Sequence, residues 1–467
     1  MKRPSLSLFA DLYELTMAAG YHAAGETSNA SFELFVRELP ATRGYLVAAG
    51  LEQAITYLET WRYTPDEVAY LRTVPALQGA DPTFFDDYLR RLRFTGDVWA
   101  VPEGTPVFAG EPILRVTAPL PEAQLVETAL LATTLFQTAV ASKAARVKEA
   151  AGERPVIEFG GRRAHGMEAA MYAARAACLA GCRATSNVDA GYRYGVTVSG
   201  TMGHSWVMAH PDERTAFSRY AAVYGTRSVL LIDTYDSIEA ARLIVGAGLR
   251  PAAVRLDSGD LVHLSRVVRD ILDAGGLAGT QILASGDLDE YKVAALLSCG
   301  APIDGFGVGT ALSTSGDAPA LSGVYKLVEI DRDGTMTPVM KLGAGKRTCP
   351  GAKQLWRVYG PVGPVSDVVG LAGEAAPTGG EPLLTRVVRG GVRQQPTRAI
   401  DQIRDACQTA VARLPDGVRR HRDAATYPVA LSPALERVAD KVASELSAPR
   451  TGRAARTARA ATAHRSS

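Results

Sequence analysis

The chain has 467 residues, of which 47% are hydrophobic and 21% charged, and its formal net charge is +2. This length and composition exclude a disordered or fibrous protein and predict a globular protein of two or three domains. No apolar run approaches the roughly 20 residues of a membrane helix, and acidic residues follow the N-terminus too soon for a signal peptide. We therefore expect a cytoplasmic protein.

From the N-terminus to about residue 120, the sequence predicts an α+β domain. A helical stretch at 10–24 precedes the strand-like segments ASFELFVREL (30–39) and GYLVAAG (44–50), and LEQAITYLET (51–60) favours another helix. In residues 97–120, Pro and Gly interrupt short apolar runs about every five residues, which is typical of a small antiparallel β unit.

Residues 121–321 follow a different pattern, in which short β-branched runs end in Gly, Ser or Asp and precede amphipathic segments of helical length. The predicted strands are VIEFG (156–160), VTVSGTMGH (196–204), VLLIDTYD (229–236), AVRLDSGD (253–260), QILASGD (281–287) and DGFGVGT (304–310). Repeated strand-helix units indicate a parallel sheet, closed into a barrel or doubly wound. Because no Gly-rich Rossmann opening is present, we favour the barrel.

The C-terminal region divides into a folded segment and a basic tail. In residues 322–448, VYKLVEI (324–330) and TPVMKLG (337–343) flank the turn DRDG, and a last helix is expected near 433–446; we expect this segment to pack back on the N-terminal domain. Residues 449–467 contain five arginines and no acid. We expect this tail to be disordered, with neither nucleic acid nor a membrane as its partner.

The five cysteines are Cys178, Cys182, Cys299, Cys349 and Cys407, and none belongs to a CxxC pair or a cluster with histidines. This spacing predicts neither a disulfide framework nor a structural zinc site. We expect reduced thiols and no dedicated metal.

In an α/β barrel the chemistry lies at the carboxyl ends of the strands. The polar residues there are Glu158, Arg162, Ser199, His204, Asp233, Asp236, Arg255, Asp257, Asp260, Ser285, Asp287, Gly309 and Thr310. The alternative for any single aspartate is a helix N-cap, since caps favour this residue type. Capping does not explain two aspartates in one loop after an arginine. A metal-dependent barrel hydrolase or lyase, or a binding module, also stays open at this point.

Ten segments in order make the sequence resemble the nicotinate phosphoribosyltransferases, a type II phosphoribosyltransferase family. They are FADLYELTMAAGY, FELFVRELP with GYLVAAGL, EFGGRRAHG, TSNVDAG, GTMGHSW, DTYDS, VRLDSGDL, ASGDLDE, FGVGT and GVYKLV, between about Leu8 and Trp356. The resemblance implies an irregular α/β barrel with an α+β domain, and a homodimer with shared active sites. It also implies an enzyme of NAD biosynthesis that makes nicotinate mononucleotide and diphosphate from nicotinate and 5-phosphoribosyl 1-diphosphate.

The resemblance further implies coupling to ATP hydrolysis, as in a C–N ligase, through a phosphohistidine at His204. A neutral imidazole is a good nucleophile at pH 7, and Gly200 and Gly203 leave room for a phosphate near the backbone. Asp233 is placed near this histidine by the match. The alternative is a nicotinamide or quinolinate phosphoribosyltransferase of the same fold.

For the nicotinate ring, the resemblance implies an aromatic platform made by Phe159 of one subunit and Tyr13 of the other. Arg162 and Arg255 would bind the carboxylate through the guanidinium fork. Asn187 stands where nicotinamide-using relatives have an aspartate, and a neutral side chain there does not repel a carboxylate.

For the phosphoribosyl group and its phosphates, the resemblance implies cations, backbone N–H groups and carboxylates. The residues are Arg37, Asp257, Ser258, Gly286, Asp287, Gly307, Gly309, Thr310 and Lys326. Mg²⁺, bound through the diphosphate, would take Asp257 or Asp287 as an oxygen ligand.

Overall fold

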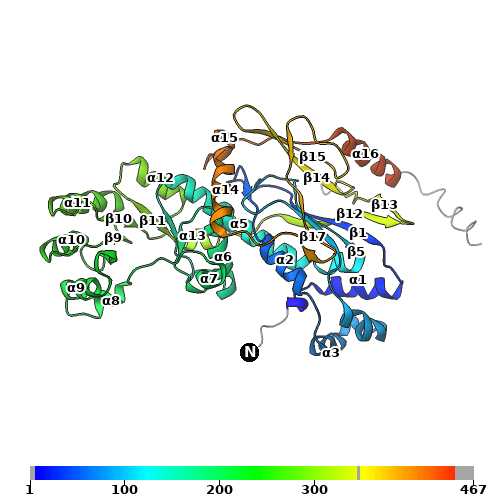
Figure 1. Cartoon of the computed structure of the whole chain (residues 1–467), viewed down its shortest axis with the longest axis horizontal. Coiled ribbons are helices and arrows are strands. Elements are labelled where there is room, and N and C mark those ends of the chain that lie inside the picture. The colour runs from blue at the N-terminus through cyan, green and yellow to red at the C-terminus, as the bar shows by residue number, and fades with distance from the viewer. Residues whose placement is uncertain (1–5, 344–347, 448–467) are drawn as a thin grey trace, which may run out of the picture.

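The computed structural model describes residues 6–343 and 348–447, so the expected tail at 449–467 lies outside the described residues. Figure 1 shows two parts side by side, a parallel sheet with its helices on the left and an antiparallel sheet with its helices on the right. This arrangement confirms the predicted fold class, an irregular α/β barrel with an α+β domain. Within the described residues, no helix is both long and apolar enough to span a bilayer.

The antiparallel part is built from both ends of the chain. The N-terminal strands pair with strands that follow the parallel sheet in sequence, so that β1 is hydrogen-bonded to β5 on one side and β12 on the other. The strand order is β13 (Thr335–Pro338), β12 (Gly323–Arg332), β1 (Asn29–Val36), β5 (Pro112–Pro119), β3 (Asp97–Ala100), β17 (Thr385–Arg389) and β18 (Val392–Arg393).

Helices cover the antiparallel sheet and complete its core. Central strands such as β1 are buried on both faces, because helices pack on one side and the C-terminal segment on the other. The elements are α1 (Leu12–Ala23), α2 (Leu51–Thr60), α3 (Pro65–Thr73), a π-helical segment (Phe84–Leu89), α4 (Leu120–Leu125) and the short strands β2 (Leu46–Val47) and β4 (Pro106–Val107).

The parallel part is a six-stranded sheet curved into a half barrel. Its strands are short apolar runs buried on both faces, as expected where helices cover a parallel sheet. Their order is β7 (Ala184–Thr185), β6 (Val156–Glu158), β11 (Gly305–Val308), β10 (Gln281–Ala284), β9 (Ala253–Leu256) and β8 (Val229–Leu231). The helices are α6 (Met167–Leu179), α7 (Val188–Tyr194), α8 (His204–Met208), α9 (Glu213–Tyr224), α10 (Ser237–Gly246), α11 (Leu261–Ala274), α12 (Glu290–Ser298) and α13 (Thr310–Ser313).

The segment 196–204, which the sequence predicts as a strand, is irregular. Its one ladder contact is an isolated bridge between Val198 and Thr185. The true partner of β6 at this edge is β7, a strand of two residues that is too short to show any periodicity. His204 therefore begins a short helix after an extended loop, rather than ending a strand.

The 25-residue helix α5 (Glu127–Ala151) joins the two parts and was not predicted from the sequence. Residues 137–147 are buried on every side and mix Ala with polar residues, so no apolar stripe marks one face. Sequence periodicity detects half-buried helices well and fully buried ones poorly.

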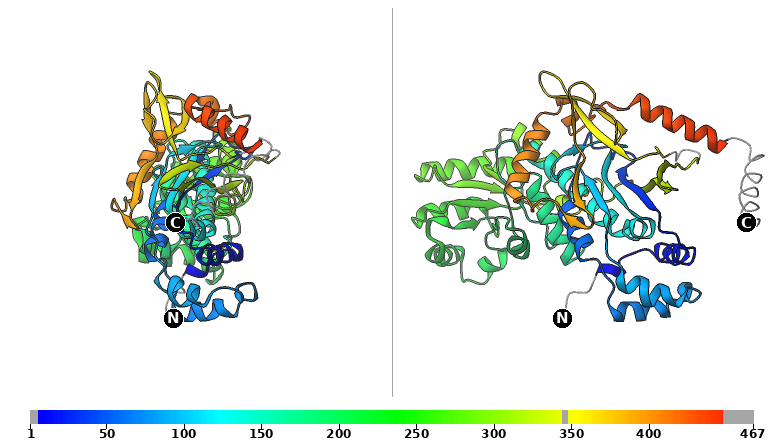
Figure 2. Two further views of the ribbon diagram at one scale, coloured as in Figure 1. Left: turned by 90° about the vertical axis from the view of Figure 1, so that its right-hand side faces the viewer. Right: turned by 45° about the vertical axis from the view of Figure 1, so that its right-hand side comes forward.

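A four-stranded sheet forms the remaining C-terminal layer. Its order is β16 (Gly380–Pro382), β14 (Lys353–Tyr359), β15 (Pro364–Leu371) and β19 (Val429–Leu431), with α14 (Ile400–Ala412), α15 (Asp416–Arg419) and α16 (Pro433–Ser447). Figure 2 shows α16, close to the predicted helix, at the edge of the molecule away from the parallel sheet.

A buried set of ion pairs, here called the junction network, ties α5 to both parts. The Lys143 ammonium lies 2.5 Å from a Glu290 carboxylate oxygen and 3.0 Å from Asp317, and Arg146 lies 3.0 Å from the other oxygen of Glu290. Arg43, from the N-terminal segment, binds Asp317 at 2.9 Å. Each charged group in this network lies within 3.0 Å of an opposite charge, and three cations share two carboxylates.

Candidate active site

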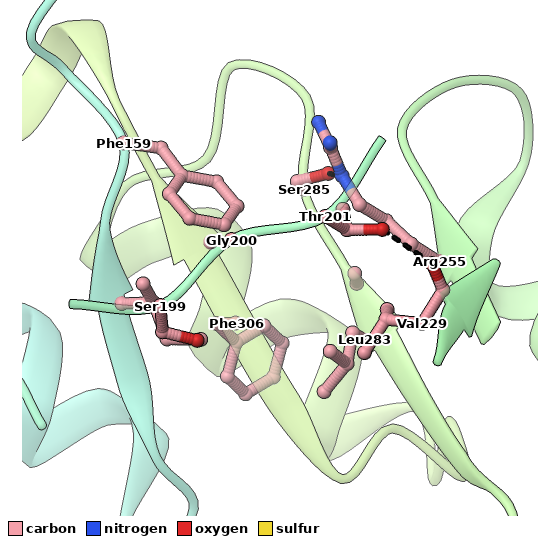
Figure 3. A pocket seen from close by; sticks show the side chains of 12 residues that line it. Phe159, Ser199, Gly200, Thr201, Val229, Arg255, Leu283, Ser285 and Phe306 are labelled. Atoms are coloured by element: carbon pink, nitrogen blue, oxygen red, sulfur yellow. Dashed lines mark hydrogen bonds between the residues drawn. The ribbon is translucent and has the colours of Figure 1, made fainter. Parts of the chain in front are cut away.

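A pocket opens at the carboxyl ends of the half-barrel strands. Its empty volume, with the open mouth included, is about 360 Å³. Figure 3 shows an aromatic ring, a guanidinium and three hydroxyls above an apolar floor. The lining residues are Ile157, Phe159, Ser199, Gly200, Thr201, Val229, Arg255, Leu283, Ala284, Ser285, Phe306 and Gly307.

Phe159 and Arg255 form one wall of the pocket. The Phe159 ring packs directly on the backbone of Gly307, where an added Cβ would lie 2.5 Å from a ring carbon. The Arg255 guanidinium carbon lies 5.4 Å from the centre of the same ring. A flat aromatic face beside a cation suits a planar, anionic aromatic ligand.

Hydrogen bonds fix the Arg255 side chain. Its Nε donates to Ser285 Oγ at 2.8 Å, and Nη2 lies 2.5 Å from Asp257 Oδ1. Burial acts to raise the pKa of Asp257, but the hydrogen bond from Ser285 and the charge of Arg255 outweigh it and hold this pKa below its usual value. Asp257 is therefore ionised at neutral pH, and its second oxygen is available to a ligand.

Asp233 organises the neighbouring loop. Its Oδ2 accepts hydrogen bonds from the Asp257 backbone N–H at 3.1 Å and from Ser258 Oγ at 2.6 Å, while Oδ1 is buried without a hydrogen-bond partner in the described structure. The next loop approaches closely at Gly286, where φ is +96° and an added Cβ would lie 1.9 Å from the Asp257 carbonyl oxygen. Only glycine fits there.

His204 is the first residue of α8 and lies partly exposed at the same edge of the sheet. Its Nδ1 lies 3.2 Å from Thr234 Oγ1, and the ring is near enough to Asp257 for its charge to act on that carboxylate. The resemblance placed Asp233 near this histidine, and the structure adds a side-chain hydrogen bond between His204 and the next residue, Thr234. In contrast, His210 turns back to the Trp206 carbonyl of its own segment, at 2.7 Å.

The structure separates the capping aspartates from those of the pocket edge. In each of three loops, the last aspartate accepts backbone N–H bonds at a helix start: Asp236 for α10, Asp260 for α11 and Asp289 for α12. The earlier aspartate of each loop is not a cap: Asp233, Asp257 and Asp287. The N-cap alternative is thus right for Asp236 and Asp260, and wrong for the other three.

Further candidates lie on the same edge without touching the pocket floor. Asp287 is exposed and adopts a left-handed conformation (φ 47°). Gly309 and Thr310 begin α13. Arg162 is exposed two residues after Gly160.

The Asn187 side chain serves as a helix N-cap, and Asn187 does not line the pocket. Its Oδ1 accepts the Ala190 N–H at 3.0 Å and caps α7. This bond uses one lone pair of the oxygen, and the side-chain NH₂ is a donor that can meet a ligand.

Three predicted residues lie outside the half barrel, on or next to elements of the antiparallel part of the same chain. Tyr13 is on α1, Arg37 follows β1, and Lys326 is within β12. Figure 1 places these elements in the antiparallel part, on the opposite side of the molecule from β8, β9 and β10. Tyr13 and Arg37 are exposed there.

Thr234, which contacts His204, was not among the predicted residues, since a lone threonine carries no pattern that distinguishes it from its neighbours. Glu158 was recognised only as a polar residue at a strand end, whereas it is buried under the Phe159 loop. Ser285 was recognised only as a polar residue at a strand end, whereas it connects Arg255 to Asp257.

Comparisons with known families give matches at both ends of the chain. Residues 8–134 match the nicotinate phosphoribosyltransferase (NAPRTase) N-terminal domain, and residues 374–439 match the nicotinate phosphoribosyltransferase C-terminal domain.

Individual relatives match over most of their length. The chain is 43% identical over 451 residues to nicotinate phosphoribosyltransferase pncB2 of Mycobacterium tuberculosis, covering 94% of this chain and 93% of that protein. It is 46% identical over 370 residues to nicotinate phosphoribosyltransferase of Bacillus subtilis, covering 76% and 74%. A crystal structure of human nicotinic acid phosphoribosyltransferase superposes with a TM-score of 0.83 at 30% identity, covering 93% of this chain and 100% of that one.

Proposed function

Because the chain belongs to the nicotinate phosphoribosyltransferase family, we propose that it makes nicotinate mononucleotide and diphosphate from nicotinate and 5-phosphoribosyl 1-diphosphate, and that ATP hydrolysis drives the step through His204. This reaction serves NAD biosynthesis by nicotinate salvage, and the proposed location is the cytoplasm. The observation that carries the proposal is the Phe159–Arg255 wall, which joins an aromatic face to a fixed cation above an apolar floor.

The base would lie flat against Phe159, with its carboxylate toward cations. Arg255 is held by Ser285 and Asp257, so its free N–H groups are preorganised for an anion. Arg162 would supply a second cation from the loop after Phe159. The Asn187 NH₂ would favour a carboxylate over a carboxamide, since an amide NH₂ would face another donor.

Ribosyl transfer builds positive charge on the sugar while diphosphate leaves, so catalysis rests on charge placement and positioning. The ionised Asp257 and the exposed Asp287 would hold the ribose hydroxyls. The backbone at Gly286, Gly307 and Gly309, with Ser258 and Thr310, would contact the phosphoribosyl group.

Mg²⁺ would enter with the diphosphate, whose charge it neutralises. No group of three or more metal-ligating side chains occurs in the described residues, so Asp257 or Asp287 would add one oxygen to ligands from diphosphate and water. This fits the reluctance of Mg²⁺ to give up its waters and its preference for oxygen.

His204 would couple ATP to this transfer. A ring nitrogen attacks the γ-phosphorus of ATP and ADP leaves; once nicotinate mononucleotide has formed, water hydrolyses the phosphohistidine and phosphate departs. Thr234 holds the ring orientation at Nδ1, and the helix start at α8 leaves the imidazole partly exposed. Asp233 acts indirectly, by fixing the Asp257–Ser258 loop beside it.

The direct test offers nicotinate, nicotinamide and quinolinate to the protein with 5-phosphoribosyl 1-diphosphate and Mg²⁺, each with and without ATP. Nicotinate with ATP should react fastest, and omission of ATP should slow it. Faster turnover of nicotinamide, or of quinolinate without ATP, would instead favour the related phosphoribosyltransferases.

A homodimer would complete the site, with Tyr13, Arg37 and Lys326 reaching the pocket edge of a second copy. The separation of these residues from the half barrel in one chain, and the exposed apolar side chains of Leu12, Tyr13 and Met17 on α1, support this proposal. Mixing two variants that each lack ATP-coupled activity, Tyr13→Ala and His204→Asn, should restore about a quarter of that activity, because half of randomly formed dimers carry one intact site. A mixture no more active than its components would contradict a shared site.

A further inference from the structure

Glu158, at the end of β6, is a fully buried carboxylate, 0% exposed, on the side of the sheet that faces the helices. Its neighbours in sequence, Ile157 and Phe159, line the pocket on the opposite face. Burial raises the pKa of Glu158, and hydrogen bonds from Thr185 and Gly160, rather than a cation, act against this rise. Cys178 and Cys182 of the helix layer are close enough for its charge to act on their thiols.

Burying a carboxylate without a cation beside it raises the free energy of the folded state unless hydrogen bonds satisfy both oxygens. Both oxygens of Glu158 are used. Oε1 accepts the Gly160 backbone N–H, and Oε2 accepts the Thr185 hydroxyl at 2.6 Å. Since Glu158 and Thr185 are directly paired residues of β6 and β7, the carboxylate joins the ends of two neighbouring strands.

The bond to Gly160 fixes the turn that carries Phe159 and Arg162. Gly160 is also confined from the other side, since an added Cβ would lie 2.3 Å from Ser313 Oγ. The turn is therefore held between the carboxylate and α13, and the direction in which Phe159 enters the pocket depends on both.

The bond to Thr185 extends the same connection to Asn187. The Thr185 Oγ1 that donates to Glu158 accepts the Asn187 backbone N–H at 3.0 Å, and Asn187 in turn caps α7. One buried carboxylate thus links the loop after β6 to the loop after β7, and both loops carry residues proposed to meet the nicotinate ring.

We propose that Glu158 is a positioning residue for nicotinate, which sets the affinity for the base by holding the Phe159 and Asn187 loops in register while touching no substrate itself. This inference rests on the proposed function. It predicts a selective effect, because the residues proposed for the phosphoribosyl group lie on β11, on the loops after β9, β10 and β11, and on the antiparallel part.

Glu158→Ala should raise the KM for nicotinate about tenfold or more and the KM for 5-phosphoribosyl 1-diphosphate less than about twofold, since small misplacements of a binding group are costly. Glu158→Gln should have an intermediate effect: its amide oxygen still accepts from Gly160, but its NH₂ cannot accept the Thr185 hydroxyl.

Thr185→Val removes the other half of the link without changing volume much. If Glu158 acts through Thr185, the double variant Glu158→Gln/Thr185→Val should raise the nicotinate KM no further than the more severe single variant. Thr185→Ser, which keeps the hydroxyl, should retain a near wild-type KM. These milder variants keep the test available if Glu158→Ala does not fold.

Glu122 offers a matched control in the antiparallel part. It is also buried, it accepts the Thr95 backbone N–H at 2.7 Å and the Thr95 hydroxyl at 3.0 Å, and burial raises its pKa. Glu122→Ala should lower the melting temperature without changing the nicotinate KM.

The inference is overturned if the Glu158 variants lose stability as Glu122→Ala does while both KM values stay within about twofold of wild type, or if the two KM values rise together. The wild-type protein distinguishes failure of the proposed function from failure of this inference. If the proposed function is wrong, the wild type will show no nicotinate-dependent diphosphate release under the same conditions.

Discussion

The junction network and the edge of the half barrel are both rich in charged groups, but the charges are buried and paired in the first and largely exposed in the second. At the junction, Lys143, Arg146, Glu290 and Asp317 are buried or nearly so, and each lies within 3.0 Å of an opposite charge. At the barrel edge, Arg162 and Asp287 are exposed, and His204 is partly exposed with a threonine as its hydrogen-bond partner.

The junction charges hold the fold together, whereas the charges at the barrel edge can meet a ligand. Paired and desolvated charges specify how α5 joins the two parts and leave no capacity for a ligand, whereas charges at the strand ends are held at fixed positions with free donors or acceptors. Buried carboxylates without a cation, such as Glu14 and Glu158, form a third group and accept hydrogen bonds from backbone N–H and threonine hydroxyl groups. Oε2 of Glu14 is buried without a hydrogen-bond partner in the described structure. Each group predicts a different response to mutation.

The largest stability effect is expected at the junction. Glu290→Ala would leave Lys143 and Arg146 without the carboxylate that pairs with both, and removing one partner of a buried ion pair costs about 3–5 kcal/mol. Urea unfolding should show this loss. An exposed edge substitution, Arg162→Ala, should change the unfolding free energy by less than about 0.5 kcal/mol. Similar losses in both variants would remove the distinction between the two regions.

Glu14 should give a pH-dependent effect of up to about 3 kcal/mol. Burial raises its pKa from 4.5 to about 7, although the hydrogen bond from Thr128 opposes the rise. Between these two pH values the unfolded chain ionises before the folded protein does, so this contribution is present below pH 4.5 and is lost as pH rises through 7. Glu14→Gln should remove the loss, matching wild type at pH 4 and exceeding it at pH 8. Parallel stability curves for the two proteins would show that Glu14 is not desolvated in this way.

At the barrel edge, Arg255→Lys should affect binding rather than stability. Lysine keeps the charge but lacks the fork that joins Ser285 and Asp257 and the flat face over Phe159. We expect the nicotinate KM to rise about 30-fold, equivalent to about 2 kcal/mol, with little change in melting temperature. Arg250→Lys, at an exposed position before β9, should leave both quantities unchanged.

The same division explains what could be predicted from the sequence. The strand-helix alternation of 229–310 is visible because each strand is an apolar run and each helix is half exposed, so β8 to β11 and α10 to α12 were predicted. The helix α5 was missed because its residues 137–147 are buried all round, and β7 because two residues carry no pattern. The antiparallel pairing of β1 with β12 joins segments almost 300 residues apart. The periodicity of a single sequence gives no information about which distant strands pair or in which register.

For the site, residue type and position predicted which side chains gather at the barrel edge, but not how they are connected. Asp236 and Asp260 could not be told from Asp233 and Asp257 by composition, since the same residue caps a helix or meets a ligand according to backbone direction. The link from Thr234 to His204 likewise depends on loop geometry that no motif encodes.

The most direct test of the account is the phosphorylation of His204. Wild-type protein and His204→Asn are incubated with γ-labelled ATP, and protein-bound label and ATP hydrolysis are measured together with nicotinate mononucleotide formation. The account predicts an acid-labile, base-stable label on the wild type and neither label nor ATP hydrolysis in the variant, which should retain slow ribosyl transfer independent of ATP. Normal ATP hydrolysis or equal labelling in His204→Asn would contradict it.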